Sequence, residues 1–109
     1  MSSERPTETN FPEDDADRIA AVVTAVDGVA ALHAGMFGEV ATYLPGRRVS
    51  GVRISTDRVD VHVSLTLNAP VRETATAIQR AVAALTDLPV DITVEDLVPV
   101  TPASRRELQ

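Results

Sequence analysis

The two histidines, His33 and His62, are the side chains best suited to acid–base or metal chemistry in this 109-residue chain. An imidazole titrates near neutral pH and is a frequent metal ligand. A metal site would need two or three more ligands around one ring, and in an extended chain Asp60 is the acidic side chain that shares a side with His62. We therefore predict no metal and no other cofactor, and interpret His62 as an exposed polar residue. A small-ligand or metal site around either histidine is the alternative.

Motifs for nucleophilic or phosphate chemistry are absent from the sequence. There is no cysteine, which excludes disulfides, thiolate metal sites and cysteine nucleophiles. No serine stands in a Gly-x-Ser-x-Gly elbow, and no glycine-rich phosphate loop follows a strand-like segment. We therefore predict that the chain is not an enzyme.

One four-residue motif, Gly35-Met36-Phe37-Gly38, matches the Gly-x-x-Gly loop with which KH-type modules clamp an RNA backbone. Here Glu39 follows the motif and no lysine flanks it. We interpret the segment as a flexible loop in which Met36 and Phe37 form an apolar anchor. Nucleic-acid binding through this loop and the Arg47-Arg48 pair is the alternative.

The charge balance argues against nucleic acid and against anionic lipid. The net charge is −6, and all 10 basic residues are arginine, whereas phosphate-rich partners require a cationic surface. The only aromatic residues are Phe11, Phe37 and Tyr43, too few for a base-stacking platform. We predict Arg47-Arg48 to be exposed after a Leu-Pro-Gly turn, where the pair could contact an acidic segment of a partner.

Nothing in the sequence resembles a membrane span or a secretory signal. No apolar run approaches the roughly 18 residues that cross a bilayer. The segment Met1 to Asp17 is acidic and polar, rather than basic and then apolar. We therefore expect a cytoplasmic protein, which could lie at the membrane through a membrane-anchored partner.

The clearest structural signal is the segment Arg58 to Asn68, in which apolar and polar residues alternate strictly. Such alternation predicts a strand with one covered face and one exposed face. The covered face would carry Val59, Val61, Val63, Leu65 and Leu67. The polar face, with Arg53 from a neighbouring strand and the arginine pair, defines our candidate interaction surface: Arg47, Arg48, Arg53, Asp60, His62, Ser64 and Thr66.

Two helices are predicted from apolar stripes of helical period. The first covers Asp14 to Val26 and ends at Gly28, a favourable residue just past a helix end. The second begins at Asn68-Ala69-Pro70, with either of the first two residues near the cap, and ends at Leu88-Pro89. Its stripe is Val71, Ala75, Ile78, Val82 and Leu85.

The remaining strands are shorter. We predict strands at Val29 to His33, Val49 to Ser55 and Val90 to Glu95, with Leu97 and Val98 either continuing the last strand or folding back. Thr56-Asp57 or Asp57-Arg58 would form a hairpin tip. The segment 34–50 is left open, with Glu39 to Leu44 as a possible helical turn before a turn at Pro45-Gly46.

The predicted order is helix, strand, strand, strand, helix, strand. Two apolar helix stripes and one apolar sheet face can bury one another, which predicts a two-layer α+β sandwich with a small mixed or antiparallel sheet and both helices on one face. Residues 14–99 would form one domain, between a disordered acidic tail at 1–13 and a flexible tail at 100–109. The order of strands in the sheet is left open.

The stretch from Ile19 to Val98 resembles the alkaline-shock-protein family, the envelope stress response proteins of Gram-positive bacteria, and His33 to Gly46 resembles its actinobacterial branch. The resemblance rests on patterns of apolar residues and turns at Val26 to Val29, Val59 to Leu67, Pro70 to Glu73, Ile78-Gln79 and Leu88 to Val98. This chain has Asn68-Ala69 and Asp87 where the family often has Tyr-Gly and Gly.

The resemblance implies a non-catalytic scaffold or adaptor in the envelope stress response, with no catalytic residues to carry over. Such a protein would act by self-association or by binding a small membrane-anchored protein or a paralogue, without inserting into the membrane itself.

Overall fold

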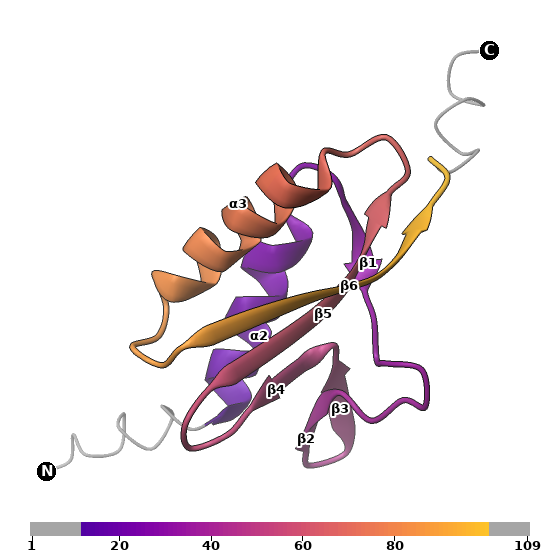
Figure 1. Ribbon diagram of the computed structural model, residues 1–109. Helices are drawn as coiled ribbons and strands as arrows, with labels where there is room; N and C mark the ends of the chain where they lie inside the picture. The colour runs from indigo at the N-terminus through magenta and orange to yellow at the C-terminus, as the bar shows by residue number, and fades with distance from the viewer. Residues whose placement is uncertain (1–11, 101–109) are drawn as a thin grey trace, which may run out of the picture.

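The computed structural model describes residues 12–100 (Figure 1). The elements are α2 (Pro12–Thr24), β1 (Val29–Leu32), β2 (Ala41–Leu44), β3 (Arg47–Ser50), β4 (Val52–Ile54), β5 (Val59–Thr66), α3 (Val71–Ala83) and β6 (Val90–Val98). The tails predicted at 1–13 and 100–109 lie almost wholly outside the described residues, although Pro12 and Glu13 already belong to α2.

β5 is the centre of the main sheet. β6 pairs with one edge of β5 in parallel along its whole length, from Val59 opposite Val90 to Thr66 opposite Val98. On the other edge, β1 pairs antiparallel with the second half of β5 and β4 with the first half. The sheet is therefore mixed, in agreement with the predicted fold class.

The core lies between this sheet and the helices. Figure 1 views the sheet from its open side, with α2 behind it and α3 along the outer side of β6. The inward side chains of β5 meet those of both helices, so the fold is the predicted α+β sandwich. The central buried residues are Ile19, Val23, Val59, Val61, Val63, Leu65, Ile78 and Val82.

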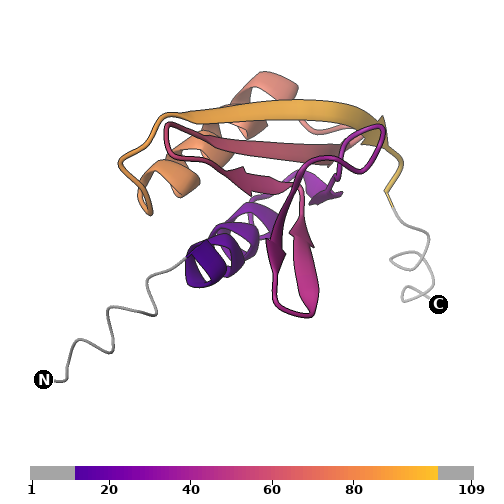
Figure 2. The ribbon, with the colours of Figure 1, turned by 90° about the horizontal axis from the view of Figure 1, so that it is seen from below.

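A second hairpin, formed by β2 and β3, fills the middle segment that the sequence left open. It projects on the helix side, next to α2 (Figure 2). Ala41 pairs with Ser50 and Leu44 with Arg47 across the predicted Pro45-Gly46 turn. The suggested helical turn at Glu39 to Leu44 was wrong: Thr42 Oγ1 instead donates a 2.6 Å hydrogen bond to the carbonyl of Val52, which joins the hairpin to β4.

Gly51 divides the strand that was predicted to run from Val49 to Ser55. Its φ is +86°, a left-handed conformation that β-strands do not contain. The Gly51 N–H donates to Val40 and the Gly51 carbonyl accepts from His62, so the chain leaves one sheet and enters the other here. A Cβ at this position would lie 2.8 Å from that of Leu32 and 3.0 Å from the carbonyl oxygen of His62.

Several predicted details of the second helix and of the β4–β5 turn are now settled. The N-cap is Pro70, without a side-chain hydrogen bond, rather than Asn68 or Ala69. Thr74 is buried in place of Val71, because its hydroxyl can donate to the Pro70 carbonyl.

Ser55 N–H donates to the Arg58 carbonyl, so Thr56-Asp57 is the tip of the β4–β5 hairpin. Leu67 lies beyond the strand and is exposed.

Candidate interaction surface

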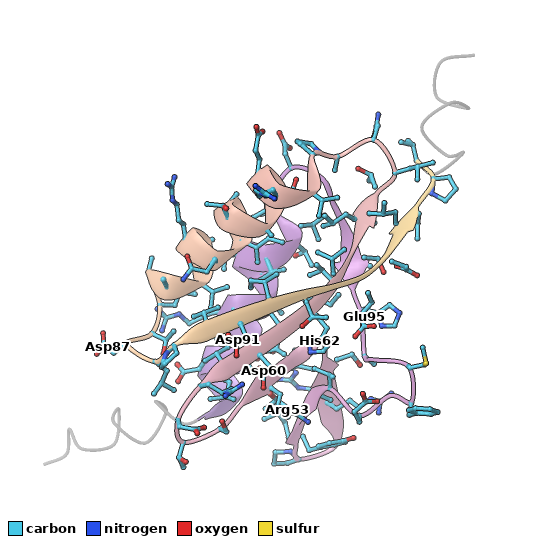
Figure 3. All side chains as sticks on the ribbon, in the orientation of Figure 1. Arg53, Asp60, His62, Asp87, Asp91 and Glu95 are labelled. Atoms are coloured by element: carbon cyan, nitrogen blue, oxygen red, sulfur yellow. The ribbon has the colours of Figure 1, made fainter. Side chains whose placement is uncertain are left out.

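The sheet face opposite α2, here called the open face, carries a row of polar side chains from three neighbouring strands (Figure 3). Period-two alternation turns them away from the core. In β4 and β5 the pair Arg53 and Asp60 lie directly opposite each other, and in β6 Asp91 lies beside Asp60 and Thr93 beside His62. The open face is defined by Arg53, Arg58, Asp60, His62, Asp91, Thr93 and Glu95.

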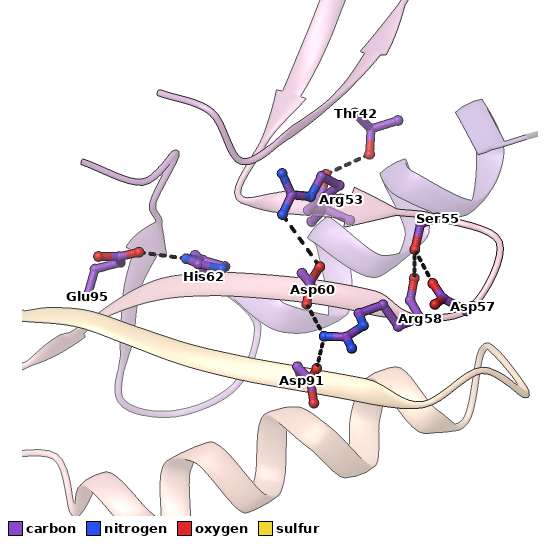
Figure 4. A network of polar contacts seen from close by, with 10 residues as sticks. Thr42, Arg53, Ser55, Asp57, Arg58, Asp60, His62, Asp91 and Glu95 are labelled. Carbon is purple, nitrogen blue, oxygen red and sulfur yellow. Dashed lines mark hydrogen bonds and ion pairs between the residues drawn. The ribbon is translucent and has the colours of Figure 1, made fainter. Parts of the chain in front are cut away.

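Four charges of alternating sign run across the first half of the open face (Figure 4). Asp60 lies 3.8 Å from Arg53 and 3.9 Å from Arg58, measured between nitrogen and oxygen. Arg58 also donates a 2.9 Å hydrogen bond to Asp91. Both arginines are half-exposed, so solvent screens these pairs and each adds little stability. Their effect is to orient two guanidinium groups at the surface.

The second half of the open face is fixed by one short contact. His62 Nδ1 lies 2.6 Å from Glu95 Oε2, and the two side chains are only 18% and 20% exposed. His62 is therefore less exposed than the sequence suggested. The pair ties β5 to β6 on the side away from the core.

The predicted surface residues separate into two groups. Arg53, Asp60 and His62 share the open face as expected. Ser64 belongs to the same row but is only 7% exposed, so it offers little to a partner, and Thr66 is half-buried at the strand end.

The arginine pair lies elsewhere. Arg47 donates two hydrogen bonds to Asp17 of α2, at 3.2 and 2.9 Å, and Arg48 is opposite Tyr43 in the hairpin. Neither belongs to the open face. The Arg47 hydrogen bonds hold the pKa of the Asp17 carboxyl below its usual value, against a smaller opposing effect of desolvation and with some help from the positive charge of Arg47.

Sequence reasoning missed Arg58, Asp91 and Glu95. Alternation within Val90 to Glu95 indicated which residues face the polar side, but not that β6 runs parallel beside β5. Only that pairing brings Asp91 and Glu95 next to Arg58 and His62.

The Gly35-Met36-Phe37-Gly38 segment joins β1 to β2 rather than two helices. Its backbone is held by its own neighbours, since Phe37 N–H donates to Glu39 Oε1 and Gly35 N–H to His33 Nδ1. Glu39 thus holds a carboxylate against this loop, and that charge would repel an RNA phosphate. Phe37 is 88% exposed, so it anchors nothing within residues 12–100.

The outer edge of β6 is flanked by α3 along part of its length (Figure 1). β6 pairs with β5 on one side, and no strand among residues 12–100 pairs with its other side. A shallow groove of about 310 Å³ follows this edge where α3 passes it. Its lining combines the α3 residues Arg72, Ala75, Thr76 and Gln79 with Val90, Asp91 and Ile92 of β6.

Residues 12–100 contain neither a cluster of metal ligands nor a membrane-spanning helix. This part of the chain contains no group of three or more histidines or acidic residues that could hold a metal ion. None of the helices described here is both long and apolar enough to cross a bilayer.

Comparison with known proteins gave no relative: no protein-family model, no curated protein and no solved structure matched the chain.

Proposed function

We propose that this chain is a non-catalytic adaptor or scaffold domain that acts by binding another protein through its main sheet. The observation that carries the proposal is the edge of β6, which no strand within residues 12–100 pairs with, beside a polar sheet face that neither helix in this range covers. A strand edge presents unpaired N–H and C=O groups to any extended chain that meets it. The ordered charges of the open face can select a partner by complementarity.

Sequence patterns direct the proposal toward the cell envelope. The resemblance to alkaline-shock proteins favours a role in envelope stress, in the cytoplasm or at the membrane through a small membrane-anchored protein or a further copy of the same kind of domain. The geometry of Gly35 to Gly38 does not favour the alternative, nucleic-acid binding, because Glu39 occupies the loop.

The test is affinity capture of the tagged full chain from its own cells, after mild crosslinking and gentle solubilisation of membranes. We expect a membrane protein or a domain of the same kind to be retained. Arg53→Glu should reduce retention, because Arg53 lies on β4, across β5 from the edge of β6, and there presents an exposed cation to an acidic group of the partner. Arg80→Glu, an equal charge change on the exposed side of α3, is the matched control.

Retention of nucleic acid or ribosomes in place of protein would overturn the proposal. Equal loss of the partner in Arg53→Glu and Arg80→Glu would also contradict it, because net charge rather than the open face would then control binding.

A further inference from the structure

Resting on the proposed function, we infer that the outer edge of β6 binds an extended segment of a partner protein in which basic and apolar residues alternate. The partner would add a strand beside β6, with its basic side chains on the open face and its apolar side chains in the groove next to α3. Three features of β6 support this pattern.

The first feature is the direction of the β6 backbone. Val59 N–H donates to the Pro89 carbonyl and Leu67 N–H to the Val98 carbonyl. In a parallel ladder successive residues turn their N–H and C=O groups to opposite edges. The register shifts by one residue after Val94, so the alternation also shifts by one residue there. The N–H groups of Ile92, Val94 and Leu97 therefore point away from β5. A partner strand would pair with these groups.

The second feature is the charge along the strand. Val90–Val98 contains Asp91, Glu95 and Asp96 and no basic residue. Asp91 and Asp96 are both exposed. Asp91 already accepts a hydrogen bond from Arg58, whereas the carboxylate of Asp96 meets no cation within residues 12–100. Basic side chains on an added strand would lie beside these carboxylates, at the distance of cross-strand neighbours.

The same charges argue against a second copy of β6 as the occupant. Two copies paired edge to edge would bring three carboxylates from each strand together. Like charges facing each other across strands are destabilising. The edge therefore favours a different, basic strand.

The third feature is the groove at α3. Its floor includes Ala75, Val90 and Ile92, and Arg72 lies in its lining. An apolar side chain fits this floor, whereas a further cation gains little, because Arg72 and Asp91 in the lining balance each other in charge. The alternation of the partner segment, basic on one side and apolar on the other, follows from the two surfaces that it would touch.

The inference can be tested on the purified full chain with labelled synthetic peptides of about the length of β6. One peptide alternates valine and arginine, a second alternates valine and glutamate, and a third has the first composition with valines and arginines in separate blocks. By fluorescence anisotropy we expect only the first to bind well, at least roughly tenfold tighter than the block peptide, and more weakly as salt is raised.

Two variants place the binding on β6. Leu97→Pro removes an outward N–H at a residue that is 42% exposed, a position where an edge strand tolerates proline. Asp96→Arg reverses a charge on the same strand. Both variants should weaken binding of the alternating basic peptide. The control is Asp27→Arg, an equal charge change in the turn before β1 on the opposite side of the sheet. It should weaken peptide binding less. Thermal unfolding identifies any variant that fails to fold.

Amide hydrogen exchange supplies a residue-level measurement. Addition of the alternating basic peptide should slow exchange at Ile92, Val94 and Leu97, because these N–H groups would gain partners. Equal binding of the acidic or block peptide, or unchanged exchange at these amides, would overturn the inference. If capture from cells still retains a protein with Asp96→Arg and Leu97→Pro, the inference fails while the proposed function stands.

Discussion

His62 and Glu95 come from two parallel strands, and their side chains meet at 2.6 Å on the face of the sheet away from the core. A contact this short between two mostly buried polar groups leaves a large desolvation penalty if either partner is removed. It is the one polar contact on the open face whose loss should be measurable in stability.

We expect Glu95→Ala to lower the free energy of unfolding by about 1–3 kcal/mol, because the His62 ring nitrogen loses its partner. Thr93→Ala, at the exposed neighbouring position on the same strand, should change it by less than about 0.5 kcal/mol. Denaturant unfolding measures both. A double-mutant cycle with His62→Ala should give a coupling above about 0.5 kcal/mol; additive effects would mean that the two side chains do not interact.

Gly51 and Gly46 offer a matched test of close packing. Both have positive φ, +86° and +78°, but only Gly51 has atoms within 3.0 Å of the position that a Cβ would occupy. Gly46→Ala should destabilise by about 1 kcal/mol through backbone strain alone. Gly51→Ala should destabilise by roughly 3 kcal/mol, since overpacking is added to strain. Similar losses in denaturant unfolding would exclude a special role for the crossing at Gly51.

Asp17 links stability to acid pH. Its folded pKa is lowered by the hydrogen bonds from Arg47, so it stabilises the fold at pH values above its unfolded pKa of about 3.9. This contribution is lost as the pH falls through the folded pKa. Both side chains are half-exposed, so the effect should be small and weakened by salt.

Carboxyl NMR titration would measure this directly. Arg47→Gln should return the pKa of the Asp17 carboxyl toward its usual value, and Asp17→Asn should remove its share of the acid dependence of unfolding. A pKa for Asp17 that is unchanged by Arg47→Gln would disprove the assignment.

The two faces of the sheet should respond oppositely to the same substitution. Val63→Asp puts an unpaired charge at a residue with no exposed surface, so we expect a loss of more than about 4 kcal/mol and an unfolded chain. Thr93→Asp, on the exposed open face, should leave the protein folded. Circular dichroism separates the outcomes, and a folded Val63→Asp protein would contradict the assigned core.

Local patterns predicted the parts of the fold that depend on neighbours in sequence. Alternation identified β5, and helical stripes identified α2 and α3, although α2 ends at Thr24 rather than Val26 and α3 at Ala83 rather than Leu88. The parts that failed depend on distant contacts: Thr42 joins Val52, and Gly51 is confined by Leu32 and His62. No periodicity within residues 34–50 reports such neighbours.

The candidate surface shows the same limit. Arg53, Asp60 and His62 could be grouped from alternation in β4 and β5 alone. Arg58 and Asp91 lie far apart in sequence and meet only because β6 is parallel to β5. The role in envelope stress rests on sequence resemblance and stays a prediction.

The central place of β5 has a consequence for synthesis of the chain. β5 is made before its parallel neighbour β6, and the whole of α3 separates the two. Until Val90–Val98 has left the ribosome, the edge of β5 opposite β1 and β4 has no strand to pair with. Distant parallel pairing is slow, and partly folded chains with open strand edges aggregate. Formation of β6 should therefore limit the yield of soluble folded protein in cells, and a chain that ends before Val90 should collect in the insoluble fraction.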